Sequence, residues 1–299
     1  MEKQESENYI KAGKIASEIR EYLRTYIKPG MKLVDIAKET DKKIKQANAK
    51  PAFPINLSLN EIAAHYTPSI DEETSAEGIL KVDFGVEIDG YIADLAFTLD
   101  LTKEKKYQEM IDLNQEILKK TLEKLNYESS VSDIGNSIHQ LLENQRFNII
   151  KNLTGHSLAQ YNIHADISIP NTKNSNKTRL QEKAIAVEPF LTTGDGEVIE
   201  GKPSEIYMLI NKKNVRDPNS KKLLNFIEQE YQTKPFCKRW LDEQGFRTNF
   251  SLKLLTKEEI VYNFPVLVEK SKQPVSQAEE TIIFHNQEKI ITTNQKASN

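Results

Sequence analysis

The sequence of 299 residues predicts an α+β layer fold, with a central antiparallel β core and helices packed on its outer faces. Three observations predict it. Segments with helical spacing of apolar residues flank segments that read as strands, and a strong hairpin signal lies at Asp89-Gly90. In addition, Leu33–Ile44 resembles Val131–Leu142. If this similarity is a true repeat, the core consists of two related halves that face each other.

The elements follow from the spacing of apolar residues along the chain. We expect helices over residues 6–26, 34–47, 103–125 and 131–144. Proline-containing loops with short strands are expected over 50–69 and 147–210. Helical spacing returns over 220–255, and the chain ends in a pair of strands, "AEETIIF" and "EKIITTN".

The composition is that of an ordinary globular protein. The net charge is -3, so nothing indicates a nucleic-acid-binding surface or attraction to an anionic membrane. No run of about 18 apolar residues predicts a transmembrane helix. The first ten residues lack the apolar region of a signal peptide. The single cysteine, Cys237, excludes an intramolecular disulfide, and we expect a cytoplasmic protein.

The hairpin at Asp89-Gly90 sets the register of its two strands. With these residues as the turn, facing residues share a side of the sheet and sides alternate along each strand. One side is then apolar apart from a tyrosine hydroxyl and should pack on helices: it carries Val82, Phe84, Val86, Ile88, Tyr91, Ala93, Leu95 and Phe97.

The other side of the hairpin holds two aspartates, Asp83 and Asp94, as diagonal neighbours. Such residues lie about 7–8 Å apart, and two carboxylates there repel each other unless a cation lies between them. Alternatively, both acids are solvated on an open face. Asp94 faces Gly85 and Asp83 faces Ala96, and these small residues favour an enclosed metal site. Glu87, nearer the turn, is expected to be solvated.

Further metal ligands must come from other segments. His156 lies in a loop among apolar residues, and Glu188 interrupts an apolar strand. Near the C-terminus, the pattern alone does not choose between Glu279 and Glu280. The chain has five histidines; His139 is expected on a helix surface, and His285 is a weaker candidate for a site.

Seven stretches, in order, resemble the pita-bread metallopeptidases, and in particular type 2 methionine aminopeptidases of the short archaeal-like form. They are "KPAFPINLSLNEIAAHYTP", "IDGYIADLAFT", "NLTGHSLAQYNIHADISIPN", "AVEPF", "GEVIEGKPSEIYML", "KPFCKRWL" and "QAEETII". The resemblance implies a pita-bread fold with a pseudo-two-fold antiparallel β core and outer helices. It also implies a catalytic domain of residues 1–207 and 268–299, with a helical insert at 208–267.

The resemblance implies two divalent metal ions, of cobalt, manganese, iron or zinc, that serve hydrolysis of the first peptide bond. Asp83 would bind one ion. His156 and Glu188 would bind the other. Asp94 and Glu279 would bridge both. The implied activity is the co-translational removal of methionine from nascent proteins with a small second residue.

Catalytic and substrate-binding roles are implied in the same way. Glu188 would also move a proton toward the leaving amine. His65 and His164 would be catalytic and substrate-binding histidines that are not metal ligands. Phe53 and Phe190 would line the methionine pocket, although both also suit a plain apolar core. The expected partners are peptides that begin with methionine and, transiently, the ribosome, and a monomer is expected.

Two features depart from the family pattern. Glu280 stands where many relatives have histidine, and the tail "QEKIITTNQKASN" lacks their terminal aromatic residue. Two other functions are compatible with parts of the pattern. A prolidase or Xaa-Pro aminopeptidase would use the same five ligands, but the insert and "NEIAAHYTP" argue against it. A scaffold without catalysis, bound to ribosomes or RNA, would be expected to have lost ligands that are present here.

Overall fold

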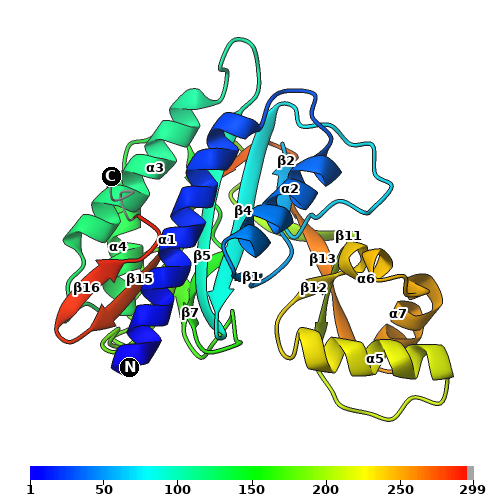
Figure 1. Ribbon diagram of the computed structural model, residues 1–299. Helices are drawn as coiled ribbons and strands as arrows, with labels where there is room; N and C mark the ends of the chain where they lie inside the picture. The colour runs from blue at the N-terminus through cyan, green and yellow to red at the C-terminus, as the bar shows by residue number, and fades with distance from the viewer. Residues whose placement is uncertain (295–299) are drawn as a thin grey trace.

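A long β-hairpin forms the centre of the molecule in a computed structural model that describes residues 1–294. Its strands are β4 (Ile79–Ile88) and β5 (Tyr91–Asp100), and helices α1 (Lys3–Tyr26) and α2 (Leu33–Gln46) lie across one face (Figure 1). The last five residues of the tail "QEKIITTNQKASN", 295–299, lie outside the described residues.

Within the described residues, the strands form four antiparallel sheets. Strands β1 (Lys50–Pro51) and β2 (Asn56–Leu59) flank β4 of the hairpin. A five-stranded sheet has the order β16 (Glu288–Ile291), β15 (Glu280–His285), β9 (Ala184–Val187), β7 (Thr154–Leu158), β8 (Ser168–Pro170). A three-stranded sheet has the order β14 (Val275–Gln277), β10 (Phe190–Thr192), β6 (Asn148–Ile149). The fourth has the order β12 (Phe236–Cys237), β11 (Val198–Leu209), β13 (Val261–Glu269), β3 (Ile62–Ala64).

The apolar face of the hairpin packs on helices, as the register predicts. Ile88 faces Tyr91 and Val86 faces Ala93. The predicted residues of this face, except Tyr91, join one core with α1 and α2. Each large apolar side chain buried in this way contributes roughly 1.5–3 kcal/mol to stability. A second core joins α3 (Gln108–Lys124) and α4 (Val131–Leu142) to the five-stranded sheet.

The sequence similarity between the second and fourth helices has a structural counterpart. The first residue of each helix is fixed by a backbone hydrogen bond to a later loop: Leu33 N–H donates to Thr74, and Val131 N–H donates to Thr178. Just before the second helix, Lys32 forms an isolated antiparallel bridge with Ser75. Just before the fourth, Ser130 forms the same kind of bridge with Arg179. These matching contacts support two related halves.

Helix α3 begins later than its periodicity predicts. The carboxylate of Asp100 accepts hydrogen bonds from the N–H groups of Thr102 and Tyr107. These bonds hold the residues after β5 in a turn, so the helix starts at Gln108 rather than near residue 103.

The segment with helical spacing near residues 220–255 forms three helices: α5 (Pro218–Glu230), α6 (Lys238–Glu243) and α7 (Thr248–Lys257). Gly245, at φ 77°, ends the turn after α6 in a backbone conformation that favours glycine. The three helices cover one face of β11–β13 and have their own apolar core (Figure 1). The boundaries 208–267 stay a prediction.

The expectation that Glu87 is solvated is wrong. Its carboxylate lies 2.9 Å from the ammonium of Lys234, just before β12, and both side chains are about 5% exposed. Arg239 of α6, also buried, forms a second ion pair of 2.8 Å with Asp41 of α2. Two charged pairs therefore join the helical segment to the rest of the chain.

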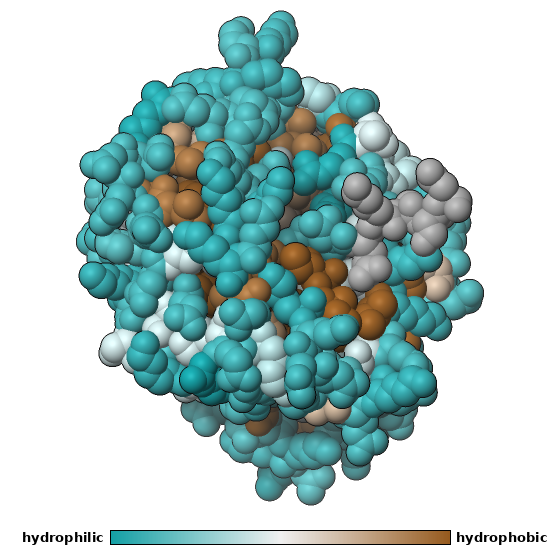
Figure 2. Space-filling view, turned by 90° about the vertical axis from the view of Figure 1, so that its left-hand side faces the viewer, coloured by the Kyte–Doolittle hydropathy of each residue, from teal (hydrophilic) through white to brown (hydrophobic). Residues whose placement is uncertain are grey.

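The outer surface agrees with the polar composition. Hydrophilic side chains dominate the face on the left-hand side of Figure 1, and apolar groups show between them in patches (Figure 2). Within residues 1–294, no helix combines the length and apolar character needed to cross a membrane.

Candidate metal centre

The hairpin places its two aspartates as the sequence predicts. Gly85 faces Asp94 and Asp83 faces Ala96 across the strand pair. Asp94 is only 3% exposed, so the alternative of two solvated acids on an open sheet face is wrong for this residue. The backbone N–H of Asp94 donates to the Thr281 hydroxyl, and that hydroxyl donates back to the Asp94 carbonyl.

Three further segments bring the remaining predicted ligands to the same face. His156 lies on β7, and Glu188 follows the last residue of β9. Glu279 lies between β14 and β15 and forms an isolated antiparallel bridge with Ala96 of the hairpin. Because this bridge lies two residues from Asp94, the two carboxylates point into one space.

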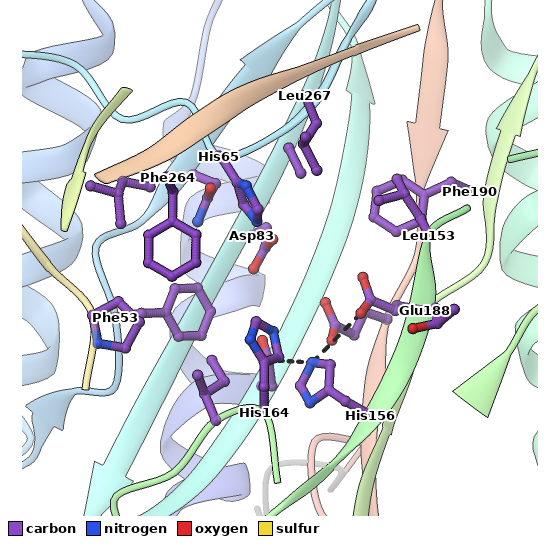
Figure 3. Close-up of a pocket in the computed structure, with 18 of the residues that line it drawn as sticks. Phe53, His65, Asp83, Leu153, His156, His164, Glu188, Phe190, Phe264 and Leu267 are labelled. Carbon is purple, nitrogen blue, oxygen red and sulfur yellow. Dashed lines mark ion pairs between the residues drawn. The ribbon is translucent and has the colours of Figure 1, made fainter. Parts of the chain in front are cut away.

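The five predicted ligands converge on one cavity (Figure 3). His156 Nε2 lies 3.5 Å from a Glu188 carboxylate oxygen and 3.7 Å from one of Asp94. Ligand atoms of Asp94, His156 and Glu279 all lie within 4.8 Å of one another. Asp83 joins the group through Gln277, whose amide donates to Asp83 (3.2 Å) and Glu279 (3.4 Å).

Burial makes the charged forms of these groups costly. It raises the pKa of Asp83 to about 7. The pKa values of Asp94, Glu188 and Glu279 are raised well above their usual range, by burial first and by mutual repulsion second. Burial, together with the neighbouring His164, lowers the pKa of His156 to about 3, so its imidazole is neutral at pH 7.

These residues fit divalent metal ions. One carboxylate oxygen each of Asp83, Asp94 and Glu279 is buried without a hydrogen-bond partner. Buried polar atoms without partners are rare because desolvation costs about 1–3 kcal/mol or more. Carboxylates with one neutral imidazole are a donor set that suits first-row divalent metals. A cation at this point would satisfy these oxygens and offset the repulsion.

Two histidines that are not expected to bind metal lie in the same cavity. The Nδ1 atom of His65 lies 3.2 Å from the carbonyl oxygen of Pro265 in β13. Burial lowers the pKa of His65 to about 4, so the neutral ring donates from Nδ1 and leaves Nε2 as an acceptor. His164 lies edge-on to His156, with 4.5 Å between ring centroids, and burial lowers its pKa as well.

The cavity has a volume of about 240 Å³ and an apolar side. In Figure 3, the rings of Phe53 and Phe264 lie across the cavity from Glu188 and Phe190. Phe53 explains why residue 85 is glycine, because a Cβ there would lie 2.4 Å from the Phe53 ring. The space beside Gly85 is therefore filled by an aromatic ring rather than left for a metal.

The other candidates from the sequence lie elsewhere. Glu280 points away from the cavity and pairs with Arg20 of α1 at 2.7 Å, which separates it from Glu279. His139 is exposed, as expected. His285 lies 2.9 Å from Glu182, outside the residues that line the cavity.

Sequence reasoning missed Gln277, Ile163, Phe264 and Pro265. Gln277 had a detectable signal, since it precedes Glu279 by two residues in an extended segment. The others had none, because each is an apolar residue whose contact with the site depends on packing between distant segments.

The sequence matches the model of "Metallopeptidase family M24" over residues 7–216, and the chain therefore belongs to this family. The particular family members that it resembles over nearly its whole length are methionine aminopeptidases. The one from Thermococcus onnurineus is 41% identical over 297 residues, covering 97% of this chain and 99% of that protein. The one from Methanocaldococcus jannaschii is 36% identical over 297 residues, covering 98% and 100%.

Solved structures of lower sequence identity share the fold. A thermophilic Arx1 has a TM-score of 0.83 at 16% identity, covering 100% of this chain and 93% of that one. The methionine aminopeptidase of Thermotoga maritima has a TM-score of 0.70 at 19% identity, covering 99% and 98%. These similarities confirm the α+β fold expected from the sequence.

Proposed function

We propose that the protein removes the N-terminal methionine from nascent chains whose second residue is small, with two divalent metal ions at the site. Methionine aminopeptidase activity follows from the family and from relatives about 40% identical over the full chain. The observation that carries the chemistry is the convergence of four carboxylates, two of them buried (Asp94 and Glu279), and a neutral imidazole in one cavity.

Five side chains would hold the metal ions. We assign Asp83 to one ion, His156 and Glu188 to the other, and Asp94 and Glu279 to both. When bound, divalent ions of cobalt, manganese, iron or zinc lower the pKa of water and polarise a carbonyl group. The buried oxygens without hydrogen-bond partners support this assignment.

The chain's own residues would then bind the substrate and move its protons. Glu188 would accept a proton and pass it to the leaving amine, and its place in the cavity beside His156 supports this role. His65 and His164 would contact the scissile amide and its carbonyl as neutral imidazoles. The rings of Phe53 and Phe190 would enclose the methionine thioether.

The lining of the cavity supports binding of a first residue with its free amino group. Aromatic rings lie on one side, where an apolar side chain would fit, and carboxylates lie on the other, where a cationic amino group would fit. We also propose a cytoplasmic monomer that meets the ribosome transiently, because the substrate is the beginning of a growing chain.

The test combines metal analysis with peptide cleavage. The purified protein is stripped with a chelator, reloaded with cobalt or manganese, and given Met-Ala-Ser and Met-Leu-Ser. We expect two metal equivalents at full activity and release of methionine from Met-Ala-Ser, with at least about tenfold slower release from Met-Leu-Ser. Full activity at one equivalent would contradict the two-ion assignment, and equal rates would contradict the preference for a small second residue.

A further inference from the structure

The sheet formed by β11 and β13 has two different faces beside the candidate site. Tyr207, Leu209 and Val261 pack against the core of helices α5–α7. Because sides alternate along strands, Met208 and its cross-strand partner Tyr262 lie on the opposite face. Among residues 1–294, the apolar core of helices α5–α7 includes no side chain of that face.

This opposite face is an apolar strip that runs from the cavity to the surface. Its residues are Ile206, Met208 and Ile210 from the β11 side and Tyr262 and Phe264 from β13. Ile206 and Phe264 line the cavity, whereas Ile210 and Tyr262 are 45% and 42% exposed. The strip therefore begins inside the site and ends in solvent.

Ring contacts connect the exposed end of the strip to a candidate catalytic residue. The rings of Tyr262 and Phe264 lie edge-to-face with centroids 5.0 Å apart. Phe264 in turn contacts the ring of His65 at 5.3 Å. His65 and Phe264 are half-buried and Tyr262 is exposed, which indicates the direction in which a chain bound at His65 leaves the cavity.

We propose that the apolar strip binds the substrate chain downstream of its second residue and favours apolar side chains there. This inference rests on the proposed function, which places the first residue of the substrate in the cavity. Its occupant is one extended polypeptide, because the strip is continuous with the site and carries no charged side chain. From Ile206 to Ile210 the strip spans four residues, or about 13 Å, which matches about four residues of extended peptide.

The test compares three peptides: Met-Ala-Ser, Met-Ala-Ser-Gly-Gly-Gly and Met-Ala-Ser-Leu-Val-Leu. Each is assayed with the cobalt-loaded full-length protein, its Tyr262→Ala and Tyr262→Phe variants, and Phe250→Ala. Phe250 is a matched control, since it is 64% exposed but lies on α7, on the helical side of the insert. The kinetic parameters kcat and KM are measured separately.

For the unaltered protein, we expect kcat/KM to be about five-fold higher for Met-Ala-Ser-Leu-Val-Leu than for Met-Ala-Ser-Gly-Gly-Gly. The difference should come from a lower KM. Tyr262→Ala should reduce this ratio to below about two, while Tyr262→Phe and Phe250→Ala should keep it. No preference in the unaltered protein, or an equal loss on all three peptides in Tyr262→Ala, would overturn the inference. If Met-Ala-Ser itself is not cleaved, the proposed function fails first, and the two failures are thus distinguishable.

Discussion

Lys234 and Glu87 form a buried ion pair of 2.9 Å that joins the start of β12 to the central hairpin. Removing one partner leaves the other charge buried and unpaired. Lys234→Met should therefore lower the free energy of unfolding by roughly 3–5 kcal/mol, measured by urea titration. The double variant Glu87→Met/Lys234→Met should recover most of that loss. As a control, Lys270→Met removes an exposed pair with Glu197 and should cost less than about 1 kcal/mol.

Asp94 is the proposed ligand of both metal ions. Asp94→Asn keeps the side-chain shape but removes the negative charge that both ions need, so methionine release from Met-Ala-Ser should fall to below about 1%. The measurement is turnover at saturating cobalt. Asp71→Asn, in an exposed loop position outside the cavity, should keep full activity. Full turnover by Asp94→Asn would contradict the assignment.

The raised carboxyl pKa values predict an unusual pH dependence for the metal-free protein. A carboxyl group whose pKa is raised on folding, such as Asp83 at about 7, binds more protons in the folded than in the unfolded state between about pH 4 and 7. The lowered pKa values of His65 and His156 act in the opposite direction below about pH 6.5, the ordinary pKa of histidine. Above that point the raised carboxyl pKa values dominate, so thermal unfolding with a chelator should show a falling Tm from about pH 6.5 to 8.

Metal binding should reverse this trend, because bound cations favour the charged carboxylates and displace their protons. With saturating manganese, the Tm should be higher than with the chelator, and the difference should grow from pH 5 to 8. In Asp83→Asn the slope of the metal-free curve should flatten. If the slope of Tm against pH is the same with chelator and with manganese, these carboxyl groups do not titrate as described.

Gly85→Ala tests the packing of Phe53 into the candidate methionine pocket. The added Cβ would lie 2.4 Å from the Phe53 ring and 2.8 Å from the Ala52 Cβ, so the ring must move. We expect KM for Met-Ala-Ser to rise about tenfold or more, and stability to fall by about 1–3 kcal/mol. In the control variant Gly201→Ala, on β11, the added Cβ would lie 3.0 Å from a side-chain methyl of Val268, and KM should stay unchanged.

Local chemistry explains which parts of the site could be predicted. The Asp89-Gly90 turn determines the register of the hairpin, and the register alone places Asp83 and Asp94 on one face. Apolar periodicity likewise predicts the first, second and fourth helices within a few residues. It places the start of α3 too early, because the Asp100 carboxylate holds the preceding residues in a turn. It does not show where the helical stretch near residues 220–255 divides, at Pro235 and Gly245.

The sequence by itself determined the short-range geometry, because turns, helix periods and strand alternation act over a few residues. Only the tertiary structure decided the contacts between distant segments. It paired Glu87 with a lysine 147 positions away, paired Glu280 with Arg20, and placed the Pro265 carbonyl on His65 across 200 positions. Such contacts depend on how sheets and helices pack, and no local pattern in either partner specifies them.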